Sequence, residues 1–209
     1  MINRSEKEKE DASSSIDRRI TETLLKQRRV FLAGGVDSKS AERLIRQFWF
    51  LDADQPGEPI LFVIHSPGGS VDAGLAIWDQ IALLRSPVTT LISGVAASMG
   101  SILSLSGQRG RRLATPNARI MIHQPSIGEC VQGQVTDLEI LTDEMMKTRE
   151  RLVQMYVDAT GKKEEEIETS LDRDTWMSVE EALEFGLLDH VVTTSEDPLL
   201  APFMSLKRD

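Results

Sequence analysis

The fold class is decided by six consecutive segments: RVFLAG (29–34), SAERLIRQFWFLDAD (40–54), ILFVIH (60–65), VDAGLAIWDQIALLR (71–85), VTTLISGV (88–95) and SMGSILSLSG (98–107). Short β-rich segments alternate in them with segments of helical periodicity, which is typical of parallel strands joined by helical crossovers. The strand expected at residues 60–64 is apolar throughout, and this favours a sheet that is covered on both faces. The sequence therefore predicts an α/β fold.

The length and the cysteine content limit the kind of protein. A chain of 209 residues corresponds to about 1.4 domains at roughly 150 residues per domain, so one elaborated domain is expected. The single cysteine, Cys130, cannot form an intrachain disulfide or build a zinc site, and free cysteine is commonest in reducing compartments. We therefore expect a cytoplasmic protein that folds without a disulfide or a metal.

The charge balance argues against several classes of partner. There are 24 Lys and Arg residues against 33 Asp and Glu, which gives a net charge of −9 and repels nucleic acid and anionic lipid surfaces. No apolar run reaches the roughly 18 residues that a membrane helix needs. We expect neither nucleic acid nor a membrane as a partner, and no cofactor.

Composition divides the chain into three parts. Residues 1–15 are polar and lack the apolar core of a secretory signal, so we expect a mobile N-terminal arm. Residues 16–193 are expected to form the single domain. Residues 194–209 contain two prolines and no periodic pattern, and the sequence assigns this C-terminal tail no role.

A long segment of helical periodicity runs from about residue 134 to 159. Its apolar residues recur at three- and four-residue steps, and they are Val135, Leu138, Leu141, Met145, Leu152 and Tyr156. The opposite face is charged. About 25 residues at 1.5 Å per residue give roughly 37 Å, which is more than one small core can cover. We therefore expect this helix to project and to pack on a neighbouring molecule.

Ser98 lies where a β-rich segment meets a helical one, among Gly94, Ala96, Ala97 and Gly100. Small residues permit a tight corner that exposes a hydroxyl beside unpaired backbone N–H groups. This is the arrangement of a nucleophile elbow, although the flanking glycines of the lipase-type motif are absent. A helix N-cap is the simpler interpretation of a lone serine at this place.

The run SPGGS (66–70) follows an apolar strand and precedes a helix. Its glycines are therefore expected at the carboxyl end of a sheet strand, where open α/β sheets bind ligands. Gly68 and Gly69 can direct backbone N–H groups at an oxyanion. The run matches neither the lysine-containing phosphate loop nor the dinucleotide fingerprint, and a plain turn is the remaining alternative.

Any imidazole base must be one of three histidines, His65, His123 and His190. His123 is the best placed, because it stands near the carboxyl end of an expected strand. For each histidine alone, a hydrogen-bonded structural role is the more common one. Spacing does not decide whether Asp172 or Asp174 orients an imidazole.

Five motifs taken together resemble a known family. They occur in the family's order and at compatible spacings, and they are SPGGS, GVAASMGS, RIMIHQPS, the GQxTD opening of the long helix, and DRDxWMS. Over about residues 27–193 the chain resembles the proteolytic subunits of the Clp protease, the ClpP family. The resemblance implies a spiral of β-α-β units of the ClpP/crotonase kind, with a projecting handle at about residues 124–159.

The resemblance also implies a serine peptidase. Ser98 is then the nucleophile, His123 the general base and acid, and Asp174 the group that orients the imidazole. The backbone N–H groups of Gly69 and Met99 match the oxyanion hole of the family.

In the family, an extended substrate is held by strand addition between two segments. One matches the run SPGGS (66–70), here called the glycine loop, and the other matches the residues that follow His123. The matching residues here are Gly68, Gly69, Pro125, Ser126 and Ile127. Family members enclose their sites in two stacked heptameric rings, a tetradecamer, and an AAA+ Clp ATPase delivers unfolded polypeptide to them. This chain has no Walker motif of its own, so ATP would belong to the partner.

The resemblance assigns assembly to Asp172 and Arg173, because the matching Asp-Arg pair makes ion pairs across the ring interface in many members. A tetradecamer of one chain and one shared with a paralogue both remain open. Two other functions are alternatives: a structural or regulatory ring subunit without turnover, and a crotonase-type acyl-CoA enzyme. Intact Ser98 and His123 count against both.

Overall fold

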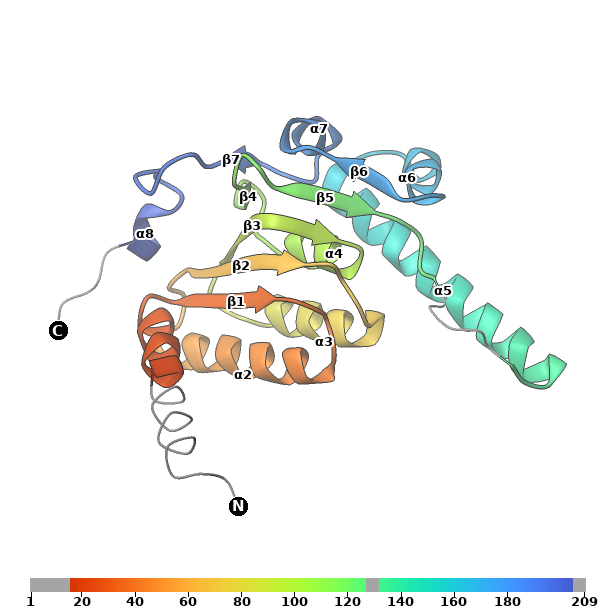
Figure 1. The fold of residues 1–209 in the computed structure, drawn as a ribbon, viewed down its shortest axis with the longest axis horizontal. Coiled ribbons are helices and arrows are strands. Elements are labelled where there is room, and N and C mark those ends of the chain that lie inside the picture. Colours follow the sequence, from red (N-terminus) through yellow and green to blue (C-terminus); the bar gives the residue numbers. More distant parts are fainter. Residues whose placement is uncertain (1–15, 127–131, 205–209) are drawn as a thin grey trace, which may run out of the picture.

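The computed structural model describes residues 16–126 and 132–204 (Figure 1). Its strands are β1 (Arg29–Ala33), β2 (Ile60–Ser66), β3 (Val88–Ala97), β4 (Arg112–Ala114), β5 (Arg119–Ile122), β6 (Thr175–Met177) and β7 (His190–Val191). A helix over residues 16–26 precedes α2 (Ser38–Asp54), α3 (Val71–Ala82), α4 (Met99–Ser104), α5 (Val135–Thr160), α6 (Glu164–Leu171), α7 (Val179–Phe185) and α8 (Ala201–Met204). The prediction of an α/β fold is confirmed, and the expected arm at residues 1–15 lies outside the described residues.

The sheet is parallel except at one edge. Strands β1, β2, β3, β4 and β7 lie side by side in this order, and each neighbouring pair is parallel. β3 pairs with β4 through residues 90–92 and with β5 through residues 95–97. It changes partner at Gly94, whose φ of +87° suits glycine. The end of β3 is therefore brought beside β5, where the candidate site is built.

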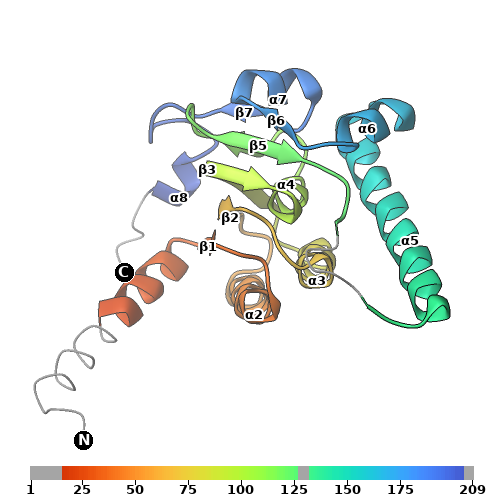
Figure 2. The same ribbon diagram turned by 45° about the vertical axis from the view of Figure 1, so that its right-hand side comes forward.

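Strand β2 shows why the sheet is apolar on both faces. Ile60, Phe62 and Ile64 are buried in the main core together with residues of α2 and α3, which lie side by side below the sheet in Figure 2. Leu61 and Val63 belong to a second, smaller apolar cluster. Because successive side chains of a strand point to opposite faces, the two clusters lie on the two sides of the sheet. The prediction of a sheet covered on both faces is confirmed.

The C-terminal segment, to which the sequence assigned no role, covers the second face. Leu200 and Phe203 are buried in the smaller cluster. The Arg29 guanidinium of β1 donates two hydrogen bonds to the carbonyl of Phe203, at 3.1 and 2.6 Å. Residues 194–204 therefore pack on the domain.

Helix α5 extends well beyond the sheet (Figures 1 and 2). Of its 26 residues, Leu152, Val153 and Tyr156 are buried, and all three lie in its second half. Val135 and Ile140, in the first half, are mostly exposed. The expectation of a projecting helix is confirmed, and its contact with a neighbouring molecule stays a prediction.

Candidate active site

Ser98 stands at the corner between β3 and α4 in a backbone conformation that few non-glycine residues adopt. Its φ is +53° and its ψ is −123°, and such a conformation costs of order 1–3 kcal/mol. The Ser98 N–H donates to the Met121 carbonyl at 2.9 Å, which ties the corner to β5. Gly100 lets the corner pack closely, because a Cβ there would lie 2.9 Å from the Ser66 carbonyl oxygen. The small residues of this segment thus build a sharp turn in which Ser98 is half-buried.

The Ser98 hydroxyl does not cap the helix that follows it. Ser98 occupies the N-cap position of α4, but its side chain makes no capping hydrogen bond. Its Oγ lies 2.8 Å from Nε2 of His123 instead. His123 directly follows β5, and the parallel pairing of Ala97 with Met121 brings the ends of β3 and β5 together. The capping interpretation is therefore wrong for this side chain.

Asp174 lies on the other side of the imidazole. Its Oδ1 is 3.2 Å from Nδ1 of His123. β6 runs antiparallel to β5 with Thr175 opposite Ile122, so the residue before β6 meets the residue after β5. The three side chains form a line of hydroxyl, imidazole and carboxylate.

Asp172 takes a different place. Its carboxylate lies 3.6 Å from Nη1 of the neighbouring Arg173, and both side chains are mostly exposed. Its carbonyl accepts a hydrogen bond from Nε2 of Gln124 at 3.1 Å. Of the two aspartates that spacing left open, Asp174 is the one that faces His123.

The glycine loop lies against the serine corner. Gly68 has a φ of +92°, and a Cβ there would lie 2.9 Å from the Met99 nitrogen, so only glycine fits. The Gly68 carbonyl accepts from the Val36 N–H at 2.8 Å, and the Val36 carbonyl accepts from the Ser70 N–H at 2.8 Å. This pairing fixes the loop but does not use the Gly69 N–H. Within residues 16–126 and 132–204, the N–H groups of Gly69 and Met99 have no acceptor.

A hydroxyl hydrogen-bonded to an imidazole, with unpaired backbone N–H groups close by, is suited to acyl transfer through a covalent intermediate. Comparisons with known proteins bear on the same chemistry. The family model described as Clp protease matches residues 12–195. The chain belongs to the Clp protease family.

Curated relatives support the same assignment to the Clp protease family. The ATP-dependent Clp protease proteolytic subunit 1 of Protochlamydia amoebophila is 56% identical over 92% of this chain and 93% of that protein. The proteins of the same name from Chlamydia muridarum and Chlamydia trachomatis serovar D are 56% and 55% identical, each over 85% of this chain and 93% of the relative. The resemblance inferred from five motifs is confirmed.

The other two histidines of this Clp protease subunit have partners away from Ser98. His65 Nδ1 lies 2.9 Å from the Ser93 carbonyl oxygen. His190 Nε2 lies 2.8 Å from Oδ2 of Asp197. Neither histidine is therefore in the place of a base for Ser98.

The segment after His123 is described only at its start. The Gln124 N–H donates to the Leu171 carbonyl at 2.7 Å, which anchors this start beside α6. Pro125 is half-buried and Ser126 is exposed. Ile127 lies outside the described residues, so its assignment to substrate binding stays a prediction.

Two polar residues beneath Ser98 were missed by sequence reasoning. Ser101 and Tyr156 are buried, and their hydroxyl oxygens lie 2.6 Å apart. The periodicity of the long helix places Tyr156 in its apolar stripe, and the signal of another role is its phenol hydroxyl among apolar side chains.

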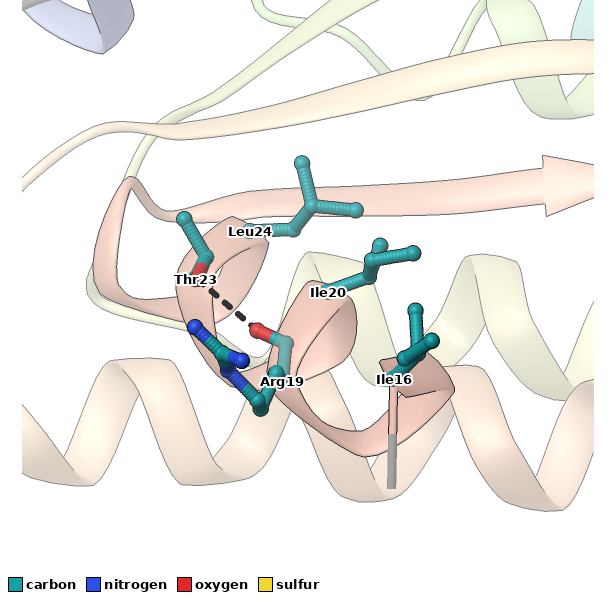
Figure 3. A pocket seen from close by; sticks show the side chains of 5 residues that line it. All are labelled: Ile16, Arg19, Ile20, Thr23 and Leu24. Carbon is teal, nitrogen blue, oxygen red and sulfur yellow. Dashed lines mark hydrogen bonds between the residues drawn. The ribbon is translucent and has the colours of Figure 1, made fainter. Parts of the chain in front are cut away.

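A separate surface hollow lies on the helix of residues 16–26 and is lined by Ile16, Arg19, Ile20, Thr23 and Leu24 (Figure 3). Thr23 Oγ1 donates to the Arg19 carbonyl at 2.8 Å within it. The hollow contains none of the site residues.

In the part of the chain that the structure describes, no three His, Cys, Asp or Glu side chains gather as a metal site, and no helix has the length and apolarity needed to cross a membrane.

Proposed function

We propose that this Clp protease subunit hydrolyses peptide bonds with Ser98 as nucleophile, His123 as general base and acid, and Asp174 as the group that orients the imidazole. The observation that carries the proposal is the 2.8 Å contact between Ser98 Oγ and His123 Nε2. This distance is within the range for a nucleophile and its base. The 3.2 Å contact of Nδ1 with Asp174 supports it.

In the acylation half of the reaction, His123 Nε2 accepts the Ser98 proton while Oγ bonds to the scissile carbonyl carbon. The tetrahedral intermediate then expels the amine, which takes the proton from Nε2 and leaves Ser98 as an ester. In the second half, a water loses a proton to Nε2 and its oxygen attacks the ester. Oγ recovers that proton when the acid product leaves. Asp174 accepts the Nδ1–H bond throughout, which holds the tautomer and stabilises the imidazolium.

The oxyanion of both tetrahedral intermediates would be held by the backbone N–H groups of Gly69 and Met99. Their lack of an acceptor in the described part of the chain supports this role. A donor of this kind contributes roughly 3 to 4 kcal/mol to lowering the barrier. The close approach of Gly68 to Met99 supports a common target for the two donors.

The substrate in this proposal is an extended polypeptide that pairs by its main chain with Gly68 and Gly69 on one side and with the segment from Pro125 on the other. Main-chain pairing requires little of the substrate sequence, so unfolded proteins are the expected substrates. Family membership supports a Clp ATPase as the partner that delivers them. The cytoplasm is the expected compartment.

Assembly into two stacked heptameric rings is also part of the proposal. The projecting half of α5 has exposed apolar residues, among them Val135 and Ile140, which fit burial against a second copy or a paralogue. Asp172 and Arg173 are exposed beside Asp174, and an ion pair across the interface would link assembly to the site.

The proposal is tested by peptide turnover and by labelling with a fluorophosphonate probe, with particle size measured in parallel. Ser98→Ala is expected to abolish both signals. Ser106→Ala is the matched control, because its hydroxyl bonds to the Leu103 carbonyl at 2.7 Å and not to the site, and it is expected to keep both. Turnover that survives Ser98→Ala would overturn the proposal. Absence of both signals in a wild-type particle of full size would favour a ring subunit without turnover.

A further inference from the structure

A buried pair of hydroxyl groups lies beneath the serine corner and is not used by the triad. Ser101 is fully buried in α4, and Tyr156 is 2% exposed in α5. Ser101 Oγ lies 2.7 Å from the Ser98 carbonyl oxygen and 2.6 Å from Tyr156 Oη. The two hydroxyls therefore connect the base of the projecting helix to the backbone of the nucleophile.

The direction of the protons follows from the acceptors. A carbonyl oxygen can only accept, so the single Ser101 hydroxyl proton is donated to Ser98. The Tyr156 hydroxyl must then donate to Ser101 Oγ. Burial raises the pKa of Tyr156, and the phenol keeps the proton that this requires. The chain runs from Tyr156 through Ser101 and ends on the Ser98 carbonyl.

That carbonyl belongs to the same peptide unit as the Met99 N–H. A trans peptide is planar, with its C=O and N–H pointing in opposite directions, and no cis bond occurs in the described residues. A hydrogen bond that holds the Ser98 carbonyl therefore also sets the direction of the Met99 N–H. The unit adjoins a residue at φ +53°, and such a conformation persists only where the surroundings hold it.

The other hydrogen bonds to this carbonyl come from within α4. The backbone N–H groups of Ser101 and Ile102 donate to it at 2.9 and 3.3 Å. They move with α4 and cannot fix the corner relative to another element. Among the described hydrogen bonds, the Ser101–Tyr156 bond is the one that joins these two hydroxyls to α5, whose first half projects outward and whose second half lies beside α4 (Figure 1).

We propose that Tyr156 and Ser101 are positioning residues that aim the Met99 N–H at the oxyanion, and so make turnover depend on where the base of α5 lies. The inference rests on the proposed function, because it takes Met99 as an oxyanion donor. Loss of the phenol oxygen should reduce the stabilisation of the transition state and leave the binding of the ground-state substrate nearly unchanged.

The test compares Tyr156→Phe, which removes one oxygen, with Ser104→Ala. Ser104 is the matched control because it is buried in the same helix and its hydroxyl makes the same kind of bond, to the Ser101 carbonyl at 2.7 Å. For Tyr156→Phe we expect kcat about tenfold lower with KM within about twofold, since removal of an oxyanion donor itself costs 10²- to 10³-fold. A peptide boronate, which mimics the tetrahedral intermediate, should lose affinity by the same factor as kcat/KM. Ser104→Ala should keep both values.

A merely structural role would give a different pattern. It would lower the melting temperature or the particle size of both variants and leave kcat of the folded, assembled fraction unchanged, and that result would overturn the inference. If peptide turnover of the wild type is too slow to compare, the rate of fluorophosphonate labelling at Ser98 replaces kcat.

The outcome for Ser98→Ala separates the two proposals. If Ser98→Ala is inactive while Tyr156→Phe keeps wild-type kcat and boronate affinity, only the positioning role fails. If Ser98→Ala still turns over peptide, or the wild type neither turns over nor labels, the proposed function fails and the positioning role fails with it.

Discussion

Ile122 of β5 lies opposite Thr175 of β6, and this register decides which aspartate meets the imidazole. The residue after one strand and the residue before its antiparallel partner face each other, so His123 meets Asp174 at 3.2 Å. The other strand pairs of the described sheet are parallel. The single antiparallel strand thus brings the chain back beside the imidazole of His123, and the proposed triad depends on this return.

Asp174→Asn is predicted to lower kcat by up to about 10⁴-fold without unfolding the protein. The amide can hold the wrong tautomer of His123 and does not stabilise the imidazolium. Asp172→Asn, the matched control, should leave the triad geometry intact and reduce the tetradecamer fraction. Turnover and analytical ultracentrifugation separate the two effects. Full turnover in Asp174→Asn would remove this residue from the triad.

Gly68→Ala is predicted to abolish turnover and to destabilise the fold. Its Cβ would lie 2.7 Å from Ser98 Cβ and 2.9 Å from the Met99 nitrogen, so the serine corner would have to move. Gly110→Ala is the control, because Gly110 has a similar φ of +82° but open space around it. It should cost about 1 kcal/mol of unfolding free energy and keep activity. Similar activity losses in the two variants would show that backbone strain, and not the close approach, matters.

The sequence predicted the sheet because alternation of apolar strands and periodic helices is a local pattern. The candidate triad was predicted from the motif resemblance, because sequence spacing alone does not decide whether Asp172 or Asp174 faces the imidazole. Their choice depends on a β5–β6 register that brings together residues about 50 positions apart. The contact of Ser101 with Tyr156 is nonlocal in the same way. No periodic signal marked Leu200 and Phe203, because Phe203 lies in a helix of one short turn, Ala201–Met204, and Leu200 comes just before that helix.

Phe203→Ala is predicted to lower the free energy of unfolding by about 3 kcal/mol, because the ring is 1% exposed against the second face of the sheet. Phe50→Ala is the matched control: Phe50 is 56% exposed, and the same truncation there should cost no more than about 0.5 kcal/mol. Urea unfolding measures both. Equal small effects would mean that residues 194–204 do not cover the sheet.

The Arg112–Asp189 pair is predicted to make stability fall in acid. Burial raises the pKa of Asp189, but hydrogen bonds from the Arg112 side chain and N–H, at 2.5 and 2.9 Å, outweigh it and hold the pKa below its usual 3.8. A carboxyl with a lowered folded-state pKa stabilises the fold above the unfolded value and loses this contribution as pH falls through the folded one. Stability should therefore decline below about pH 4.

Asp189→Asn tests this pair. It leaves the buried Arg112 without its carboxylate partner, which should cost about 3 kcal/mol at pH 7. It should also flatten the decline of stability below about pH 4. Glu42→Gln, in an exposed pair with Arg46, should change neither quantity by more than about 0.5 kcal/mol. An unchanged acid slope in Asp189→Asn would assign acid sensitivity to other carboxyls.

The nucleophile is tested most directly by mass spectrometry of the fluorophosphonate-treated protein, with the modified residue located in its peptide. Because Ser98 Oγ lies 2.8 Å from His123 Nε2, we predict one phosphonyl group per subunit, on Ser98. It should form at the rate at which peptide turnover is lost, and it should be absent in His123→Ala. Modification at another residue, or loss of turnover with Ser98 unmodified, would contradict it.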